Sequence, residues 1–151
     1  KVDLVVINEQ EACEIANEKI LLSAMESIMS GDALHGGSAA GKGPNGLIVK
    51  RGSGGVIAML PCGIIALPAF PTKNIVDPTG CGDSFAGSLL AHLVGRRGVL
   101  NDQDSMRSAL IHATVSASFT LGAIGINGIV NIERGPYHAR VDKYRRIVGL
   151  S

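Results

Sequence analysis

The chain opens on a continuous apolar run, and this run sets the first constraint on its fold. Residues 2–7 are β-branched or aliphatic except at Asp3. A run without polar alternation predicts a strand buried on both faces, which is typical of a parallel sheet. Strands and helices alternate at both ends of the sequence. We therefore expect a layered α/β fold.

The residues after this run predict the start of a helix. Asn8 is a suitable N-cap, and Glu11 three residues later gives a pattern close to a capping box. We expect this helix to pass through Ala16 and a second helix to begin at about Lys19. Residues 31–46 are rich in Gly, Ser and Ala and predict a long loop.

The rest of the sequence predicts three short strands and then three helices. The strands are expected to form a small antiparallel ribbon, with a glycine turn between the first two of them. They are expected at residues 47–49, 56–60 and 64–67, and the helices at residues 84–95, 102–122 and 140–148.

The composition excludes several classes of function. The 151 residues, 46% apolar and 18% charged, are typical of a folded domain with its own core. The net charge of +1 is too small for a nucleic-acid footprint, and the 3% of aromatic residues excludes a surface of base-stacking rings. The 20 glycines instead indicate a protein that works through its backbone.

The cysteines and the hydropathy pattern point to a reducing, aqueous environment. The three cysteines are far apart, and none forms a CxxC pair. This pattern favours neither a structural zinc site nor a disulfide framework, so we expect a cytoplasmic protein. Because the sequence has no apolar stretch of bilayer-spanning length, we expect no membrane partner.

Two glycine patterns in the long loop resemble nucleotide-binding motifs but lack the neighbouring structure that those motifs require. Residues 36–42 match the first part of a Walker A loop, but Gly43 replaces the hydroxyl residue that would bind magnesium. The glycines at 41, 43 and 46 spell GxGxxG. A strand rather than a helix is predicted after both patterns, so no helix N-terminus is available for a phosphate.

The segment from Asp77 to Phe85 has a more informative pattern. Two glycines flank one small residue, and an amphipathic helix follows at once. Such a turn can direct backbone N–H groups toward an anion at a helix N-terminus. Asp83 would then lie beside that anion, where it could take a proton from an attacking hydroxyl. The alternative is that Asp83 only caps the helix and that the glycines form a tight turn.

Several motifs in this sequence together resemble a known enzyme family. DPTGCGDSFAGSLLAHL, residues 77–93, resembles the C-terminal signature of the ribokinase-like (PfkB) carbohydrate kinases. Residues 8–11 resemble the family's N-x-x-E motif, and residues 47–55 and 112–123 resemble the segments that border its ATP site. The resemblance implies a three-layer α/β/α, Rossmann-like fold. The chain would form its C-terminal portion, with a mostly parallel sheet and a small antiparallel ribbon.

The resemblance implies a catalytic role for the glycine turn. Asp83 matches the family's catalytic base, which activates the acceptor hydroxyl. Gly80, Cys81 and Gly82 match the anion hole for the transferred phosphoryl group. Cys81 departs from the family's usual Ala, although only its backbone N–H is needed. A thiol at a helix N-terminus also favours its thiolate. We therefore expect Cys81 to be alkylated faster than Cys13 and to be protected by ATP.

The resemblance also implies metal ions at two places. Asn8 and Glu11 match the motif that organises Mg²⁺ through water, with a simple capping box as the alternative. The carbonyl groups of Asp77 and Thr79 lie where family members hold a monovalent cation such as K⁺.

ATP is the nucleotide that the resemblance implies. Lys50, Gly52 and Gly55 match positions along its phosphates and ribose, and His112 matches a position near the adenine. The alternatives are a solvated lysine at a strand end for Lys50 and a helix histidine without a ligand for His112.

The length of the chain differs from that of the resembling family, whose members are about twice as long. Residues 1–151 would be the ATP-binding and catalytic C-terminal part, with the acceptor-binding N-terminal half absent. The implied reaction is ATP-dependent phosphorylation of a sugar or nucleoside hydroxyl, with a homodimer formed through the absent half. The alternative is a non-catalytic nucleotide-binding module of the same fold, which would act as a sensor or docking surface.

Overall fold

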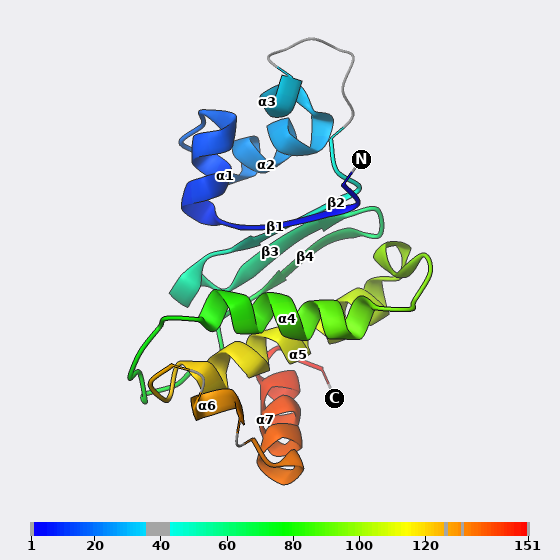
Figure 1. Cartoon of the computed structure of the whole chain (residues 1–151). Coiled ribbons are helices and arrows are strands. Elements are labelled where there is room, and N and C mark those ends of the chain that lie inside the picture. The colour runs from blue at the N-terminus through cyan, green and yellow to red at the C-terminus, as the bar shows by residue number, and fades with distance from the viewer. Residues whose placement is uncertain (1, 36–42, 126, 131, 151) are drawn as a thin grey trace. The chain divides into compact units, whose positions relative to one another are not determined.

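The computed structural model describes residues 2–35, 43–125, 127–130 and 132–150 (Figure 1). The chain divides into two compact units. One consists of residues 1–66 and 100–103, and the other of residues 67–99 and 104–151. The Walker-like residues 36–42 lie outside the described residues, as does the first glycine of the GxGxxG pattern.

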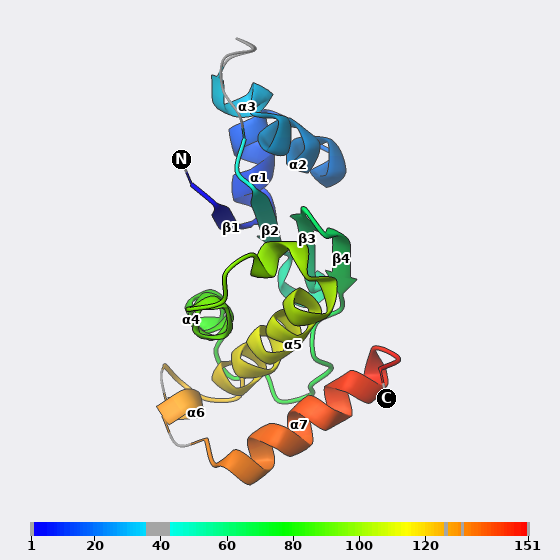
Figure 2. The ribbon, with the colours of Figure 1, turned by 90° about the vertical axis from the view of Figure 1, so that its right-hand side faces the viewer.

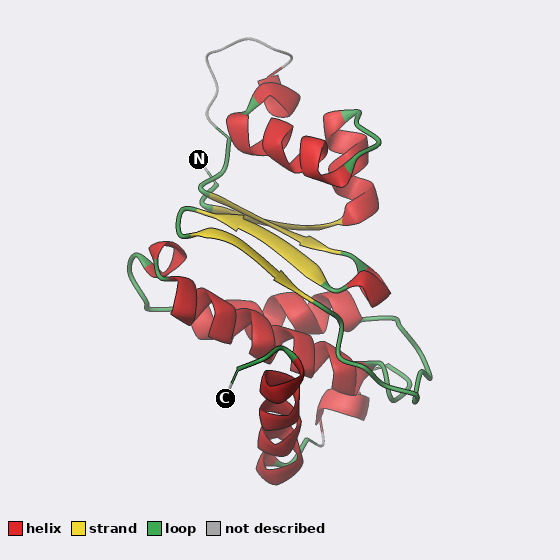
Figure 3. Ribbon diagram, turned by 180° about the vertical axis from the view of Figure 1, so that it is seen from behind, coloured by secondary structure: helices red, strands yellow, loops and turns green. Residues whose placement is uncertain are grey.

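A four-stranded mixed sheet forms the centre of the first unit (Figure 3). Strand β1 pairs with β2 in parallel, which confirms the expected parallel first strand, and β2 pairs with β3 in antiparallel orientation. The three short strands join β1 in one sheet rather than forming a separate ribbon. In chain order the strands are β1 (Leu4–Asn8), β2 (Gly46–Lys50), β3 (Val56–Leu60) and β4 (Gly63–Leu67).

Two helices, α1 (Glu9–Ala16) and α2 (Leu21–Ser30), pack on this sheet through an apolar core. Met25 of α2 and Leu47 of β2 are both fully buried in that core. Each such side chain contributes about 1.5–3 kcal/mol to folding. The predicted loop at 31–46 is wrong at its start, because α3 (Asp32–His35) continues the helical path there.

Four helices form most of the second unit, and two of them begin earlier than the sequence predicts. Helix α4 begins at Cys81, because Gly80 before it adopts the left-handed conformation that turns the chain into the helix. Helix α7 begins at Arg134, since Pro136 lies in its first turn, where a missing N–H costs nothing. The four helices are α4 (Cys81–Leu93), α5 (Gln103–Thr120), α6 (Asn127–Val130), which was not predicted, and α7 (Arg134–Ile147).

Helices α4 and α5 run antiparallel and meet through side chains spaced four residues apart. Two hydroxyl pairs and one pair of stacked histidine rings make this ladder, which fixes the register of the two helices. The rungs are Thr120 to Ser84 at 2.7 Å, Ser116 to Ser88 at 3.0 Å, and His112 on His92 with ring centroids 4.4 Å apart.

Helix α5 is buried on most sides, and α7 contacts it across a second face (Figure 2). The Tyr144 side chain of α7 is fully buried and donates its hydroxyl to the Pro68 carbonyl. Burial raises the pKa of Tyr144 to about 12. In the part of the chain that the structure describes, no helix is both long and apolar enough to cross a membrane.

Candidate active site

The glycine turn before α4 is held in shape by hydrogen bonds within itself. The Thr79 N–H donates to Asp77 Oδ1 at 2.9 Å, which forms an Asx turn. Gly80 follows with φ +80°, a conformation that favours glycine. Hydrogen bonds from Thr79, side chain and backbone, and from the Gly125 backbone hold the pKa of Asp77 below its usual value. Asp77 therefore stays ionised as the anchor of this turn.

The turn leaves several backbone donors open at the N-terminus of α4. The Cys81 N–H donates to the Pro78 carbonyl at 3.2 Å, so this predicted anion donor is already engaged in the turn. Among the described residues, no acceptor meets the N–H groups of Gly80, Gly82 and Asp83, and no side chain caps the helix. Open N–H groups at a helix N-terminus attract an anion.

The Asp83 carboxylate lies beside these open donors. Asp83 is exposed in the first turn of α4, and within the described ranges no protein group bonds to its carboxylate. The structure therefore argues against the alternative in which Asp83 caps the helix. An unbonded carboxylate next to an anion site is available to accept a proton from a bound hydroxyl.

Two hydroxyl residues that sequence reasoning missed support the turn from behind. The Thr120 hydroxyl donates to Ser84 Oγ at 2.7 Å, and the Ser84 hydroxyl donates to the Gly80 carbonyl at 2.9 Å. Thr120 is only 2% exposed. Because Thr120 lies 36 residues from Ser84 in sequence, no local pattern could have paired them.

The expected reactivity of Cys81 is not supported. Burial and the nearby Asp77 charge raise the pKa of the Cys81 thiol, which disfavours the thiolate. Its Sγ contacts the Ala117 carbonyl at 3.6 Å. With the thiolate disfavoured in this way, rapid alkylation of Cys81 is no longer expected.

In the first unit, Asn8 and Glu11 form a complete capping box at the start of α1. Asn8 Oδ1 accepts from the Glu11 N–H, and Glu11 Oε2 accepts from the Asn8 N–H, both at 2.8 Å. Glu11 is exposed, and its second carboxylate oxygen has no partner in the described part of the chain. An exposed carboxylate oxygen fits Mg²⁺, which keeps most of its waters when it binds protein.

The predicted nucleotide residues of this unit lie at the carboxyl ends of β1 and β2. Lys50 pairs with Asn8 in the parallel register, so the structure brings these two predicted site residues together. Gly52 and Gly55 follow in a tight turn with φ of +54° and +88°. A Cβ added to Gly52 would meet no atom within 4 Å, so the backbone there is open to a ligand.

His112 lies well away from the glycine turn. Its ring packs on His92, which follows Ser84 by about two turns of α4, or about 12 Å along the helix axis. His92 stacks on its ring, and the hydroxyl of Tyr137 lies 2.9 Å from its Nδ1. Burial, together with the charges of His92, His138 and Arg145, lowers the pKa of His112. The ring is therefore neutral at pH 7, with Nε2 as its remaining polar atom.

The described part of the chain contains no metal site made of side chains alone. Among the described residues, no group of three His, Cys, Asp or Glu side chains is placed to hold a metal ion. The backbone carbonyls of Asp77 and Thr79 accept no hydrogen bond from the described part of the chain. Uncommitted carbonyl oxygens are suitable ligands for a hard cation.

Comparisons with known proteins relate this chain to one family. The model of the pfkB family of carbohydrate kinases matches residues 1–131. No curated protein matches the chain in sequence at a significant level.

Several solved structures share its fold. Aminoimidazole riboside kinase from Salmonella enterica, crystallised with aminoimidazole riboside and an ATP analog, matches with TM-score 0.69 and 20% identity over 92% of this chain and 42% of its own. Fructokinase from Vibrio cholerae, with fructose, ADP and calcium bound, matches with TM-score 0.73 and 18% identity over 92% and 41%. Ribokinase from Thermotoga maritima matches with TM-score 0.65 and 23% identity over 93% and 42%.

These matches show the fold of the chain and the share of each kinase that it covers. The chain spans about two fifths of the length of each of these three kinases. Its α/β architecture is ribokinase-like, as the sequence predicted. Since the family model matches most of its residues, the chain belongs to the pfkB family of carbohydrate kinases.

Proposed function

We propose that this chain is the ATP-binding and catalytic C-terminal part of a kinase that phosphorylates a hydroxyl group of a sugar or nucleoside. The observation that carries the proposal is the open N-terminus of α4. It combines N–H groups without acceptors with an exposed, unbonded carboxylate on Asp83. Phosphoryl transfer needs these two functions together, an anion site for the moving group and a base for the attacking hydroxyl.

In this proposal Asp83 accepts the proton of the acceptor hydroxyl as that oxygen attacks the γ-phosphorus of ATP. The N–H groups of Gly80, Gly82 and Asp83 stabilise the negative charge on the transferred phosphoryl group. The Cys81 N–H contributes only if it leaves the Pro78 carbonyl or is shared with it. The Thr120–Ser84–Gly80 hydrogen bonds keep the turn fixed, so that little reorganisation is needed during transfer.

The nucleotide roles follow the family resemblance. Lys50 places a positive charge near the phosphates, the open backbone at Gly52 and Gly55 approaches the ribose and phosphates, and the His112 edge faces the adenine. Glu11 would hold Mg²⁺ through a water molecule on its free oxygen. When bound with ATP, Mg²⁺ neutralises phosphate charge. The Asp77 and Thr79 carbonyls would hold a monovalent cation such as K⁺.

The acceptor class comes from relatives. The three kinases of known structure described above are named for an aminoimidazole riboside, for fructose and for ribose. We therefore propose a sugar or a nucleoside as the acceptor, with ATP as the phosphoryl donor. We also propose a cytoplasmic protein that forms a homodimer through a part of the protein outside this chain.

The test is ATP consumption by the full-length protein against a panel of sugars and nucleosides. We expect one acceptor to stimulate ADP formation and to yield a phosphorylated product by mass spectrometry. ATP binding without acceptor-stimulated turnover across the panel would instead support the non-catalytic nucleotide-binding module.

A further inference from the structure

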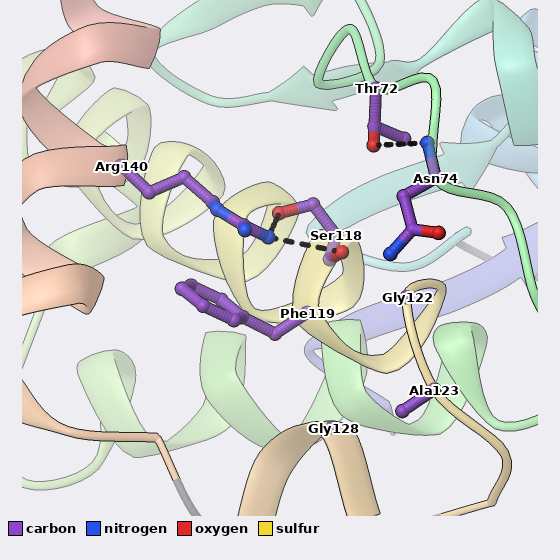
Figure 4. A pocket seen from close by; sticks show the side chains of 8 residues that line it. All are labelled: Thr72, Asn74, Ser118, Phe119, Gly122, Ala123, Gly128 and Arg140. Carbon is purple, nitrogen blue, oxygen red and sulfur yellow. Dashed lines mark hydrogen bonds between the residues drawn. The ribbon is translucent and has the colours of Figure 1, made fainter.

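A pocket in the second unit is not used by the proposed reaction. It has a volume of about 220 Å³, below the roughly 300–1,000 Å³ of pockets for drug-sized ligands. It lies beside the C-terminal end of α5 (Figure 4). Its wall consists of Thr72, Asn74, Ser118, Phe119, Gly122, Ala123, Gly128 and Arg140. None of these residues is acidic, so the pocket offers no carboxylate to a ligand.

The Arg140 guanidinium is held in a fixed orientation in this wall. Its Cζ lies 3.6 Å from the centroid of the Phe119 ring, which is a close cation–π contact. Its Nη1 donates to both the carbonyl and the hydroxyl oxygen of Ser118, at 3.2 Å each. The packing and the two hydrogen bonds together fix the plane of the guanidinium before any ligand arrives.

The charge of Arg140 is not neutralised by the protein. Among the described residues, no carboxylate pairs with Arg140, and its Nε and Nη2 groups have no acceptor. Burial lowers the pKa of this arginine, because the partly buried cation has lost solvent without gaining a counter-ion. Its helix adds to the positive field, since α7 carries four other Lys and Arg side chains against one Asp.

Neutral donors stand on the other side of the pocket. In Figure 4 the Asn74 side chain lies on the opposite side of the pocket from Arg140. No described residue bonds to its amide. The Asn74 backbone N–H donates to the Thr72 hydroxyl oxygen at 3.1 Å, which fixes this loop and leaves the hydroxyl proton free. The pocket therefore offers a guanidinium, a side-chain amide and a hydroxyl, each of which can donate a hydrogen bond to a ligand.

Helix α6 forms part of the pocket wall through its backbone. A Cβ added to Gly128 would lie 2.2 Å from the Phe119 carbonyl oxygen, so only glycine allows α6 to pack this close to α5. The volume of about 220 Å³ suits a small ligand.

We propose that this pocket binds a small phosphate-type oxyanion, either inorganic phosphate or the phosphate group of a small ester. Arg140 supplies the charge and the planar N–H pair, and Asn74 and Thr72 donate to the remaining oxygens. A tetrahedral anion has acceptors in all of these directions, whereas a carboxylate has only two oxygens in one plane. The site is separate from the glycine turn and does not depend on kinase activity.

The test is calorimetric titration of the full chain with inorganic phosphate, glycerol 3-phosphate and acetate, in the presence of saturating ATP. We expect phosphate or its ester to bind and acetate to bind much more weakly. Tighter binding of the ester would identify an ester as the ligand, and equal binding would identify free phosphate. Acetate binding as tight as phosphate would overturn the proposal, as would the absence of any binding.

Two variants and one control locate the site. Arg140→Lys keeps the charge but loses the planar fork, and we expect it to weaken phosphate binding about tenfold or more. Asn74→Asp, at an exposed position, should weaken binding similarly by adding a negative charge. Arg146→Gln removes an exposed charge from the same helix outside the pocket and should leave binding nearly unchanged.

The controls also separate this pocket from the turn before α4. Circular dichroism would establish that each variant is folded, and Asn74→Asp gives an answer even if Arg140→Lys does not fold. Phosphate binding that is unchanged in Asn74→Asp would place the anion outside this pocket and overturn the proposal. Binding that is seen without ATP and lost when ATP is added would assign the anion to the glycine turn and would also overturn it.

Discussion

Helices α1 and α4 both begin beside predicted site residues, but they differ in whether side chains bond to the backbone N–H groups at the helix N-terminus. At α1, Asn8 and Glu11 bond to each other's backbone at 2.8 Å, so side chains satisfy the helix end. At α4, the N-cap is Gly80, no side chain caps the helix, and Asp83 has no partner within the described residues. A helix end that leaves its donors and a nearby carboxylate unused gives up stability that α1 retains. This difference supports the proposal that the N-terminus of α4, rather than that of α1, receives an anion.

The largest expected effect comes from Asp83. Asp83→Asn should lower phosphoryl transfer in the full-length protein by about 10²–10⁴-fold, because it removes the general base. ATP affinity should stay the same or increase, because a negative charge near the phosphates is lost. Steady-state kinetics and nucleotide titration measure the two effects. A variant with near-normal turnover would show that Asp83 is not the base.

The second prediction separates the two roles of the capping box at α1. Asn8→Ala should lower the free energy of unfolding by about 0.5–2 kcal/mol, because the Glu11 N–H loses its acceptor. Glu11→Gln keeps a side chain that can accept from the Asn8 N–H but removes the charge. It should be nearly as stable as the parent and should need more Mg²⁺ for half-maximal activity. An unchanged Mg²⁺ requirement would leave Glu11 with its structural role alone.

The third prediction concerns the support behind the α4 turn. Thr120→Val keeps the shape of this buried side chain but removes the hydroxyl that donates to Ser84. We expect a loss of about 1 kcal/mol in unfolding free energy and a lower kcat with little change in the KM for ATP. Ser116→Ala removes the next rung of the ladder and is the matched control. Equal losses of kcat in both variants would mean that Thr120 acts only through helix packing.

The smallest expected effect is a dependence of stability on pH that arises from His112. Because its folded pKa lies below the ordinary value of 6.5, the unfolded chain binds this proton more readily. His112 therefore lowers stability as the pH falls through about 6.5 toward the folded pKa. Thermal unfolding from pH 8 to 5 should show a shallower decline in His112→Gln than in the parent. Identical pH profiles would exclude this contribution.

The sequence predicted local structure well where the pattern itself carries the information. The parallel first strand, the strand at residues 56–60 and the capping box at Asn8 and Glu11 are all confirmed, since each depends on neighbours in sequence. The start of α7 was misplaced because Gly135 and Pro136 weaken the helical pattern in its first turn. The roles assigned to the site residues remain predictions, although the open donors beside Asp83 favour them.

Features that depend on tertiary contacts could not be predicted. The Thr120–Ser84 bond and the stacking of His92 on His112 bring together residues that lie far apart in sequence. The raised pKa of Cys81 depends on burial, which a motif does not reveal. Arg140 looked like an ordinary charged residue of the last helix, and only its packing on Phe119 beside a pocket distinguishes it.

The most direct test of the central claim is amide hydrogen exchange at the two helix ends, with and without a nucleotide. The nucleotide would be ADP with a metal fluoride, which mimics the transferred phosphoryl group. We predict that the Glu11 amide is protected in the free protein and that the Gly82 and Asp83 amides exchange rapidly until the ligand protects them. Gly82 and Asp83 amides that are already protected without the ligand, or that remain unprotected at saturation, would contradict the account.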